Sequence, residues 1–195
     1  KAINPGIVMV NVSAYGQYGP YKDRVGFDQI GQALGGLMSM TGFPDDPPTR
    51  TYFSLIDRIT SLHGTIGALA ALLERERTGR GQAIDVSLAD TGFTVNEIPI
   101  AAYLGDGQLQ AREGNGAGVT NAYETSDGWA FVIALNDAMW ERMCEAIEKP
   151  EWKKDERMRT RAGRVAHADI LEPELVVWFR NRTTKEAVDR LSKFG

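Results

Sequence analysis

The stretch Tyr52–Leu88, with the sequence YFSLIDRITSLHGTIGALAALLERERTGRGQAIDVSL, decides the fold. Its apolar residues recur at steps of three and four from Ile59 to Leu73, which predicts a long helix. Gly79 follows the charged end of this helix and can supply the left-handed stop. Apolar and polar residues then alternate over Ala83–Leu88, as in a strand. We therefore expect a loop, a helix, a tight basic turn and a strand.

Asp57 lies where the predicted loop becomes the predicted helix. A carboxylate at that point can accept hydrogen bonds from free amides of the first turn, and the helix dipole favours its charge. An N-cap role is the ordinary interpretation of such an aspartate. Two glycines inside the helix, Gly64 and Gly67, each cost about 1 kcal/mol relative to alanine. Their presence predicts that a backbone or a ligand approaches this helix closely.

The composition excludes several classes of protein. The chain has 195 residues, 43% of them hydrophobic, and a net charge of −4, which argues against a general nucleic-acid binder. A single cysteine, Cys144, excludes internal disulfides and suits a reducing compartment. The two histidines, His63 and His167, are too few and too scattered for a metal cluster. No apolar run is long enough to span a bilayer and no signal peptide is visible, so we expect a cytoplasmic protein without a membrane partner.

The first half of the chain predicts an α/β fold with a parallel sheet. Ile7–Val12 is almost entirely apolar, as in a strand that is buried on both faces. A loop rich in glycine and tyrosine follows at 13–21, and ligands of α/β proteins bind at such loops. We expect a glycine-containing helix over Phe27–Met40 and a second apolar helix over Ala89–Leu104, kinked or divided at Pro99.

The second half predicts a small α+β domain. Trp129–Leu135 has the pattern of a strand, Asp137–Glu148 that of an amphipathic helix, and two further helices are expected near 168–180 and 184–193. We interpret the basic connector Lys153–Arg164 as a solvated face. The expected division of the chain is a large domain, a glycine-rich linker and the start of a small domain, over residues 1–104, 105–121 and 122–195.

Several stretches, taken in order, carry a family resemblance. They are NPGIVMVNVSAYGQYGPY (Asn4–Tyr21), RVGFDQIGQALGGLMSMTG (Arg24–Gly42), PDDPPTR (Pro44–Arg50), Asp57–Leu88, YETSDGW (Tyr123–Trp129) and MWERMCEAIEKPEW (Met139–Trp152). Together they resemble the class III CoA-transferase family (CaiB/BaiF type), which includes formyl-CoA transferase and carnitine CoA-transferase.

The resemblance implies that residues 1–104 are part of a CoA-binding, Rossmann-like large domain. It also implies an interlocked homodimer of chains about twice this length. The chain opens at Lys1 close to a strand and ends at Gly195 after an amphipathic helix. We therefore expect a segment of a longer protein, without the first Rossmann-like stretch and without the segment that returns to the large domain.

In the family, an aspartate just before this glycine-rich helix is the nucleophile, and Asp57 occupies that position. The resemblance implies that its carboxylate attacks an acyl-CoA thioester and that CoA passes to an acceptor carboxylic acid through aspartyl intermediates. Acyl-CoA is then a substrate, and no permanently bound cofactor or metal is expected. Four residues match a family stretch that contacts CoA, and three match its glycine loop over the acyl group. The first set is Arg24, Val25, Phe27 and Asp28, and the second is Gly116, Ala117 and Gly118.

Two alternatives stay open. The same fold includes α-methylacyl-CoA racemases, in which a Gly-His-Asp triplet stands where this chain has Gly26-Phe27-Asp28. Phenylalanine cannot move a proton, and His63 within the helix is no obvious substitute, so the transferase is favoured. The other alternative is a non-catalytic acyl-CoA-binding segment.

Overall fold

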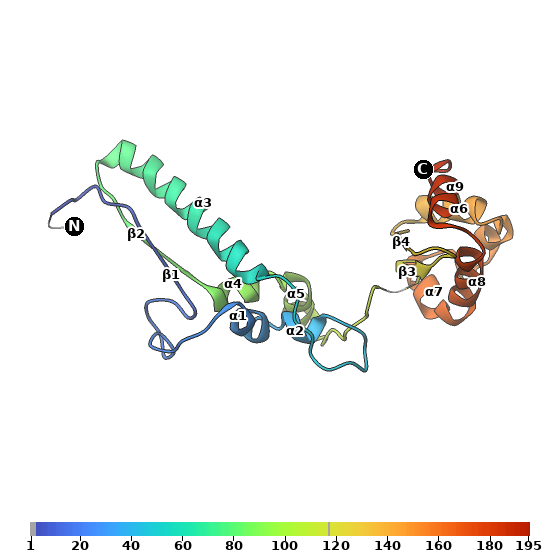
Figure 1. The fold of residues 1–195 in the computed structure, drawn as a ribbon, viewed down its shortest axis with the longest axis horizontal. Coiled ribbons are helices and arrows are strands. Elements are labelled where there is room, and N and C mark those ends of the chain that lie inside the picture. The colour runs from blue at the N-terminus through green and yellow to red at the C-terminus, as the bar shows by residue number, and fades with distance from the viewer. Residues whose placement is uncertain (1–2, 117) are drawn as a thin grey trace. The chain divides into compact units, whose positions relative to one another are not determined.

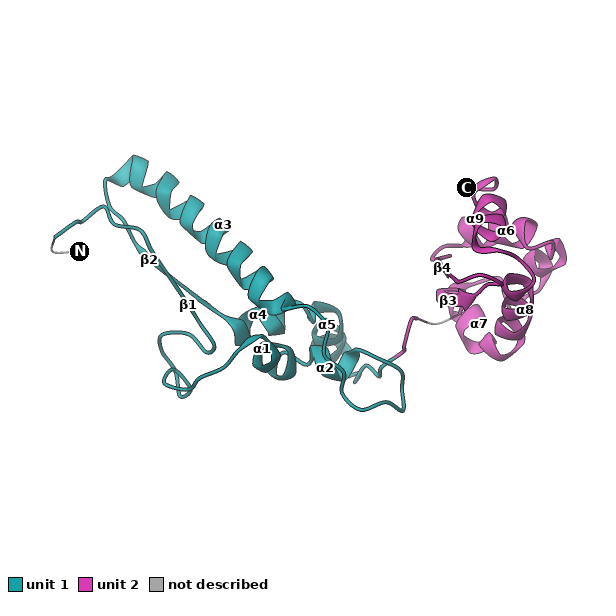
Figure 2. Ribbon diagram, viewed as in Figure 1, with its two compact units in different colours: residues 1–112 teal, residues 113–195 magenta. Residues whose placement is uncertain are grey.

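The computed structural model describes residues 3–116 and 118–195. The chain forms two compact units, residues 1–112 and 113–195 (Figure 2). Each unit has its own strand pair and its own helices. The assignment of these units to a CoA-binding domain and a small domain stays a prediction.

A pair of parallel strands forms the centre of the first unit. Strand β1 (Met9–Ser13) pairs with β2 (Ala83–Ser87) in the register Met9 to Ala83 through Ser13 to Ser87. Parallel neighbours need a long crossover, and here it contains three helices. These are α1 (Asp28–Leu34), α2 (Leu37–Met40) and α3 (Leu55–Thr78). Two more helices, α4 (Leu88–Thr94) and α5 (Glu97–Asp106), follow β2. The predicted α/β class with a parallel sheet is confirmed.

The long helix α3 lies along both strands (Figure 1). It packs through its small residues, because a Cβ added at Gly64 would be 3.2 Å from Val10 and one added at Gly67 would be 2.8 Å from Ile84. The close approach predicted for these glycines is therefore made by strand side chains. The larger residues on the other side of α3 stay exposed, and they are Leu62, Ile66, Leu69 and Leu73.

The prediction that the first strand is buried on both faces is wrong for the described residues. Met9, Val10 and Val12 are 49%, 37% and 55% exposed. Within the first unit, α3 is the helix that runs along this strand pair, so one face of the pair is left open. Apolar composition predicted the strand itself but not which element would cover it.

Helices α1 and α4 cross at very short range. A Cβ added at Gly35 would collide with the backbone of Gly92, so the contact needs glycine. The helix predicted over residues 27–40 is interrupted at Gly36, which has a φ of +82° and is the N-cap of α2. The helix predicted over residues 89–104 is likewise divided, with Pro99 in the first turn of α5.

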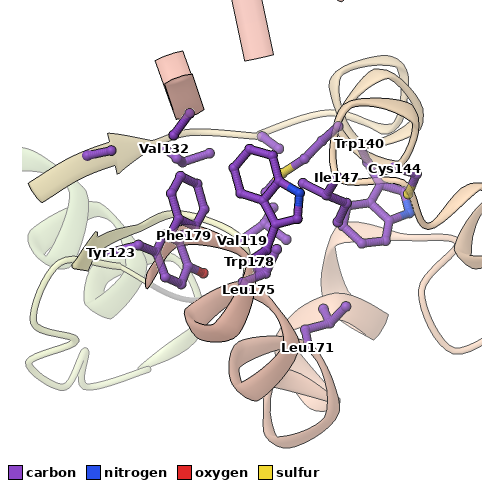
Figure 3. Close-up of a cluster of buried hydrophobic side chains, with 14 of the residues drawn as sticks. Val119, Tyr123, Val132, Trp140, Cys144, Ile147, Leu171, Leu175, Trp178 and Phe179 are labelled. Atoms are coloured by element: carbon purple, nitrogen blue, oxygen red, sulfur yellow. The ribbon is translucent and has the colours of Figure 1, made fainter. Parts of the chain in front are cut away.

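The second unit packs helices against an antiparallel pair, β3 (Asn121–Glu124) and β4 (Trp129–Val132). Its helices are α6 (Asp137–Ala146), the 3-10 helix η1 (Pro150–Lys154), α7 (Arg161–Ala166), α8 (Ala168–Arg180) and α9 (Thr184–Ser192). Figure 3 shows the core, where Tyr123 stacks on Phe179 at 4.7 Å between ring centroids and Trp140 is 1% exposed. Strand β3 and helix α7 were not predicted from the sequence.

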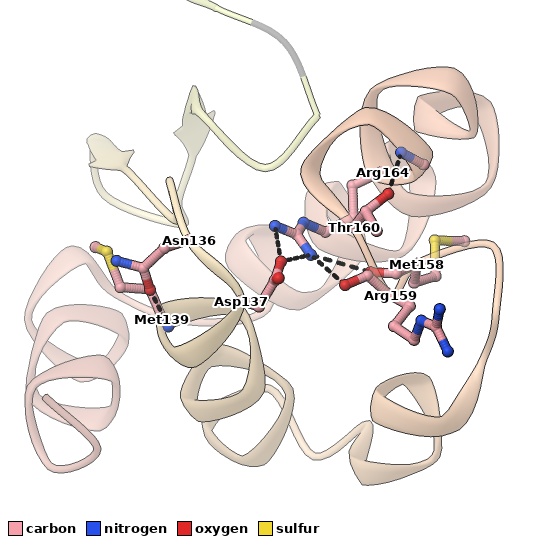
Figure 4. Close-up of polar contacts among 8 residues, drawn as sticks. Asn136, Asp137, Met139, Met158, Arg159, Thr160 and Arg164 are labelled. Atoms are coloured by element: carbon pink, nitrogen blue, oxygen red, sulfur yellow. Dashed lines mark hydrogen bonds and ion pairs between the residues drawn. The ribbon is translucent and has the colours of Figure 1, made fainter.

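The interpretation of the basic connector Lys153–Arg164 as a solvated face is wrong for Arg164, which is buried. Its side chain is 1% exposed. The guanidinium donates to Asp137 Oδ1 at 3.1 Å and to the Met158 carbonyl at 3.0 Å (Figure 4). A buried arginine needs such partners, and these contacts join α7 to the start of α6.

Candidate functional site

Asp57 is the third residue of α3 and its side chain is exposed. It lines a cavity of about 290 Å³. The other lining residues come from the end of β1, the entry to α1, the first turns of α3 and the start of α4. They are Val12, Ser13, Ala14, Gly26, Phe27, Ser61 and Leu88. The cavity thus lies at the carboxyl end of a parallel strand, where α/β folds hold their ligands.

The start of α3 is capped by a side chain from α1. Asp28 Oδ1 accepts hydrogen bonds from the amides of Ile56 at 2.7 Å and Asp57 at 3.1 Å. Ser54 occupies the N-cap position without a side-chain cap. The interpretation of Asp57 as the N-cap is therefore wrong. Its own carboxylate accepts no hydrogen bond from the described residues, and it is left facing the cavity.

The electrostatic surroundings make the Asp57 carboxylate more basic than an ordinary aspartate. Partial burial raises the pKa of Asp57, and the nearby negative charge of Asp28 raises that pKa further. A more basic carboxylate is a stronger nucleophile in its ionised form.

Phe27 and Asp57 line the same cavity, and the chain just before Phe27 passes close to Ala14 at Gly26. A Cβ added at Gly26 would lie 2.8 Å from Ala14 Cβ, so any larger residue would push the entry of α1 away from β1. Phe27 follows at the N-cap position of α1 and is 76% exposed. Its ring is an apolar surface beside the exposed carboxylate.

Similarity to known proteins identifies the family of this chain. The family model described as CoA-transferase family III matches residues 1–195. The chain belongs to CoA-transferase family III. It is 37% identical over 198 residues to succinyl-CoA–D-citramalate CoA-transferase of Chloroflexus aurantiacus, covering all of this chain and 49% of that protein. It is 27% identical to formyl-CoA:oxalate CoA-transferase of Rhodopseudomonas palustris, covering all of this chain and 51% of that protein.

A solved structure shares the fold of this family member. A CAIB/BAIF family protein from Brucella suis matches with a TM-score of 0.85 and 31% identity, over all of this chain and 52% of that one. The chain spans about half the length of the curated relatives it matches.

The residues predicted to contact CoA have different surroundings. Phe27 lines the cavity, whereas Arg24 and Val25 do not. Val25 is 89% exposed, and the Arg24 guanidinium lies 4.0 Å from the centre of the Tyr21 ring. Asp28 is 2% exposed, with both carboxylate oxygens bonded to protein groups. A contact of Arg24, Val25, Phe27 or Asp28 with CoA stays a prediction in this family member.

The predicted glycine loop belongs to the second unit. Gly116 and Gly118 have φ angles of +132° and +68°, which favour glycine. Ala117 lies outside the described residues. The role of this loop over the acyl group is an untested prediction.

One cavity residue, Ser61, and one buried amide, Gln32, were not predicted from the sequence. Ser61 is one helical turn beyond Asp57 and donates its hydroxyl to the Asp57 carbonyl at 2.8 Å, and its spacing of four was a readable signal. Gln32, which donates a hydrogen bond to Asp28, follows it by four residues on the predicted helix, and that spacing was also a readable signal.

The described ranges 3–116 and 118–195 hold no cluster of three or more potential metal-binding side chains. Within the same ranges, no helix is both long and apolar enough to cross a bilayer.

Proposed function

We propose that the full protein transfers CoA from an acyl-CoA thioester to a carboxylic acid, with Asp57 as the covalent nucleophile. The observation that carries this proposal is the Asp57 carboxylate, which lines a cavity beside Phe27 and accepts no hydrogen bond from the described residues. Membership of CoA-transferase family III supports it.

The reaction needs two pairs of acyl transfers. An Asp57 oxygen bonds to the thioester carbonyl carbon and the C–S bond breaks, which gives a mixed anhydride and CoA thiolate. The thiolate attacks the aspartyl carbonyl, releases the donor acid as a carboxylate and leaves an aspartyl-CoA thioester. The acceptor carboxylate then attacks this thioester and frees CoA thiolate again. Attack of the thiolate on the acceptor acyl carbon gives the new acyl-CoA and restores the Asp57 carboxylate.

The residues around Asp57 suit this chemistry. Phe27 offers an apolar surface for the pantetheine arm, and Arg24 offers an exposed cation for a phosphate. Residues 116–118 would cover the acyl group. We place residues 1–104 in a Rossmann-like CoA-binding domain, with 105–121 as linker and 122–195 as the start of the small domain.

The substrates proposed are small dicarboxylic acids. Relatives at 32–37% identity are named as CoA-transferases that act with succinyl-CoA or succinate, on citramalate, malate, mesaconate or glutarate. Succinyl-CoA is therefore the first donor to test. We also propose a homodimer of interlocked chains and a cytoplasmic location.

The second candidate is an α-methylacyl-CoA racemase, which would need an acid and a base on the two sides of the α-carbon. Phe27 lines the cavity where a base would be required. His63 does not line it, and its Nδ1 lies 3.4 Å from the Thr91 hydroxyl. These two placements favour the transferase.

The test is transfer from succinyl-CoA to a panel of dicarboxylic acids by the full-length protein. Asp57→Asn is compared with Glu76→Gln, which removes one exposed carboxylate from the far end of the same helix. Transfer that is lost in the first variant and kept in the second supports the proposal. Undiminished transfer by Asp57→Asn contradicts it. Exchange of the α-hydrogen with deuterated solvent, without any acceptor acid, would favour the racemase, and binding of acyl-CoA without either reaction would favour a non-catalytic segment.

A further inference from the structure

A buried hydrogen-bonded chain connects α1 to the residue proposed as the nucleophile. Asp28 and Gln32 are one helical turn apart on α1 and are 2% and 0% exposed. Gln32 Nε2 donates to Asp28 Oδ2 at 2.5 Å. The other oxygen, Asp28 Oδ1, accepts the amides of Ile56 and Asp57.

The orientation of the Gln32 amide is fixed from its other end. The amide nitrogen of Thr51 donates to Gln32 Oε1 at 2.9 Å. A flipped amide would set its NH2 group against the Thr51 N–H, donor against donor. Gln32 therefore presents its NH2 group to Asp28 and its carbonyl to the loop that enters α3.

A buried carboxylate is stable only when its oxygens are hydrogen-bonded. Asp28 has three such bonds, two from the start of α3 and one from Gln32. Without Gln32, the carboxylate would lose one of its three hydrogen bonds, and the Oδ1 atom that accepts the Asp57 amide would be held less rigidly. Small displacements of a reacting group can lower a rate by about 100-fold.

We propose that Gln32 is a positioning residue for Asp57, which it holds in place through Asp28 and Thr51. The role in catalysis rests on the proposed function. Gln32 touches neither the cavity nor Asp57 directly, because it acts through the Asp28 carboxylate and the backbone of α3.

The hydrogen bond between Gln32 and Asp28 can be broken by either of two single variants and restored by the double variant. Gln32→Glu sets two carboxylates against each other, and Asp28→Asn can set two NH2 groups against each other. The double variant Asp28→Asn with Gln32→Glu restores a donor facing an acceptor and keeps an acceptor for Thr51. Asn96→Ala is the matched control, since Asn96 is also buried and donates to the Gly35 carbonyl at the end of the same helix.

The full-length protein and these variants are compared in kcat and KM for succinyl-CoA, and in a carbon NMR titration of the Asp57 carboxyl group. We expect each single variant to lower kcat by about tenfold or more and to leave KM within about threefold. We expect the double variant to recover most of kcat and the control to stay close to wild type. Each single variant is also expected to change the Asp57 titration midpoint, which the control leaves unchanged.

Folded single variants with wild-type kcat and an unchanged Asp57 titration would overturn the proposal, and so would a control that loses as much activity as Gln32→Glu. If the single variants unfold, failure of the folded double variant to recover kcat overturns it too. A wild-type protein without transfer activity, whose Asp57 titration still responds to Gln32→Glu, would contradict the proposed function and leave Gln32 as a positioning residue.

Discussion

The amide of Asp57 donates a hydrogen bond to the carboxylate of Asp28 at 3.1 Å, so the two acidic residues meet at the start of one helix. Asp28 accepts the amides of Ile56 and Asp57, which a side-chain cap at Ser54 would otherwise bind. The carboxylate of Asp57 is left exposed to the cavity, with a negative charge nearby. This arrangement leads to the predictions below.

As pH falls, attack of Asp57 on the thioester should stop at a higher pH than it would for an aspartate with an ordinary pKa. The nucleophile is the ionised form, and partial burial together with the charge of Asp28 raises the pKa of Asp57. As pH falls through that raised pKa, the carboxylate is protonated and attack stops. The rate of the first acyl transfer, measured against pH, should show a midpoint above the value of about 3.9 for a free aspartate. A midpoint at or below that value would contradict the electrostatic argument.

Phe27→Ala should weaken binding of acyl-CoA more than it slows chemistry. Removing the exposed ring takes away apolar contact that substrate and transition state share, so KM should rise by about tenfold with little change in kcat. Phe43→Ala is the control, because Phe43 is also exposed and does not line the cavity. Equal effects of both variants on KM would show that Phe27 has no special place in the site.

Gly35→Ala should destabilise the first unit. The added methyl group meets the Gly92 backbone, which no side-chain rotation can relieve. We expect the free energy of unfolding to fall by about 1–3 kcal/mol in a denaturant titration. Gly105→Ala is the control, since its Cβ has no neighbour within 4 Å inside α5, and alanine there should be neutral or stabilising. A stable Gly35→Ala protein would disprove the close contact of α1 and α4.

Tyr123→Phe should leave the second unit as stable as before or more stable. The ring stacks on Phe179, while its buried hydroxyl has no hydrogen-bond partner among the described residues. Phenylalanine keeps the stacking and removes the unpaired group, so the free energy of unfolding should stay equal or rise by about 1 kcal/mol. Tyr123→Leu removes the stacking as well and should be the less stable variant. A loss of stability in Tyr123→Phe would reveal a partner for the hydroxyl.

Local patterns predicted the elements around Asp57 but not the contacts between them. The spacing of apolar residues predicted α3, and alternation predicted β2. The role of Asp28 as the cap of α3 depends on how the entry of α1 folds back, which no local pattern encodes. For the same reason, Gly64 and Gly67 were expected to face a backbone or a ligand, and they face Val10 and Ile84. Burial of strand β1 was also predicted wrongly, because composition does not determine which element covers a strand.

The central claim is tested most directly by trapping the acyl intermediate on Asp57. The full-length protein is mixed with succinyl-CoA and hydroxylamine, digested, and analysed by mass spectrometry. We expect a hydroxamate on the Asp57 side chain that depends on succinyl-CoA, persists in Glu76→Gln and disappears in Asp57→Asn. Asp57→Asn should remain folded, because the described residues donate no hydrogen bond to this carboxylate. CoA transfer without modification of Asp57, or with the hydroxamate on another carboxylate, would contradict the account.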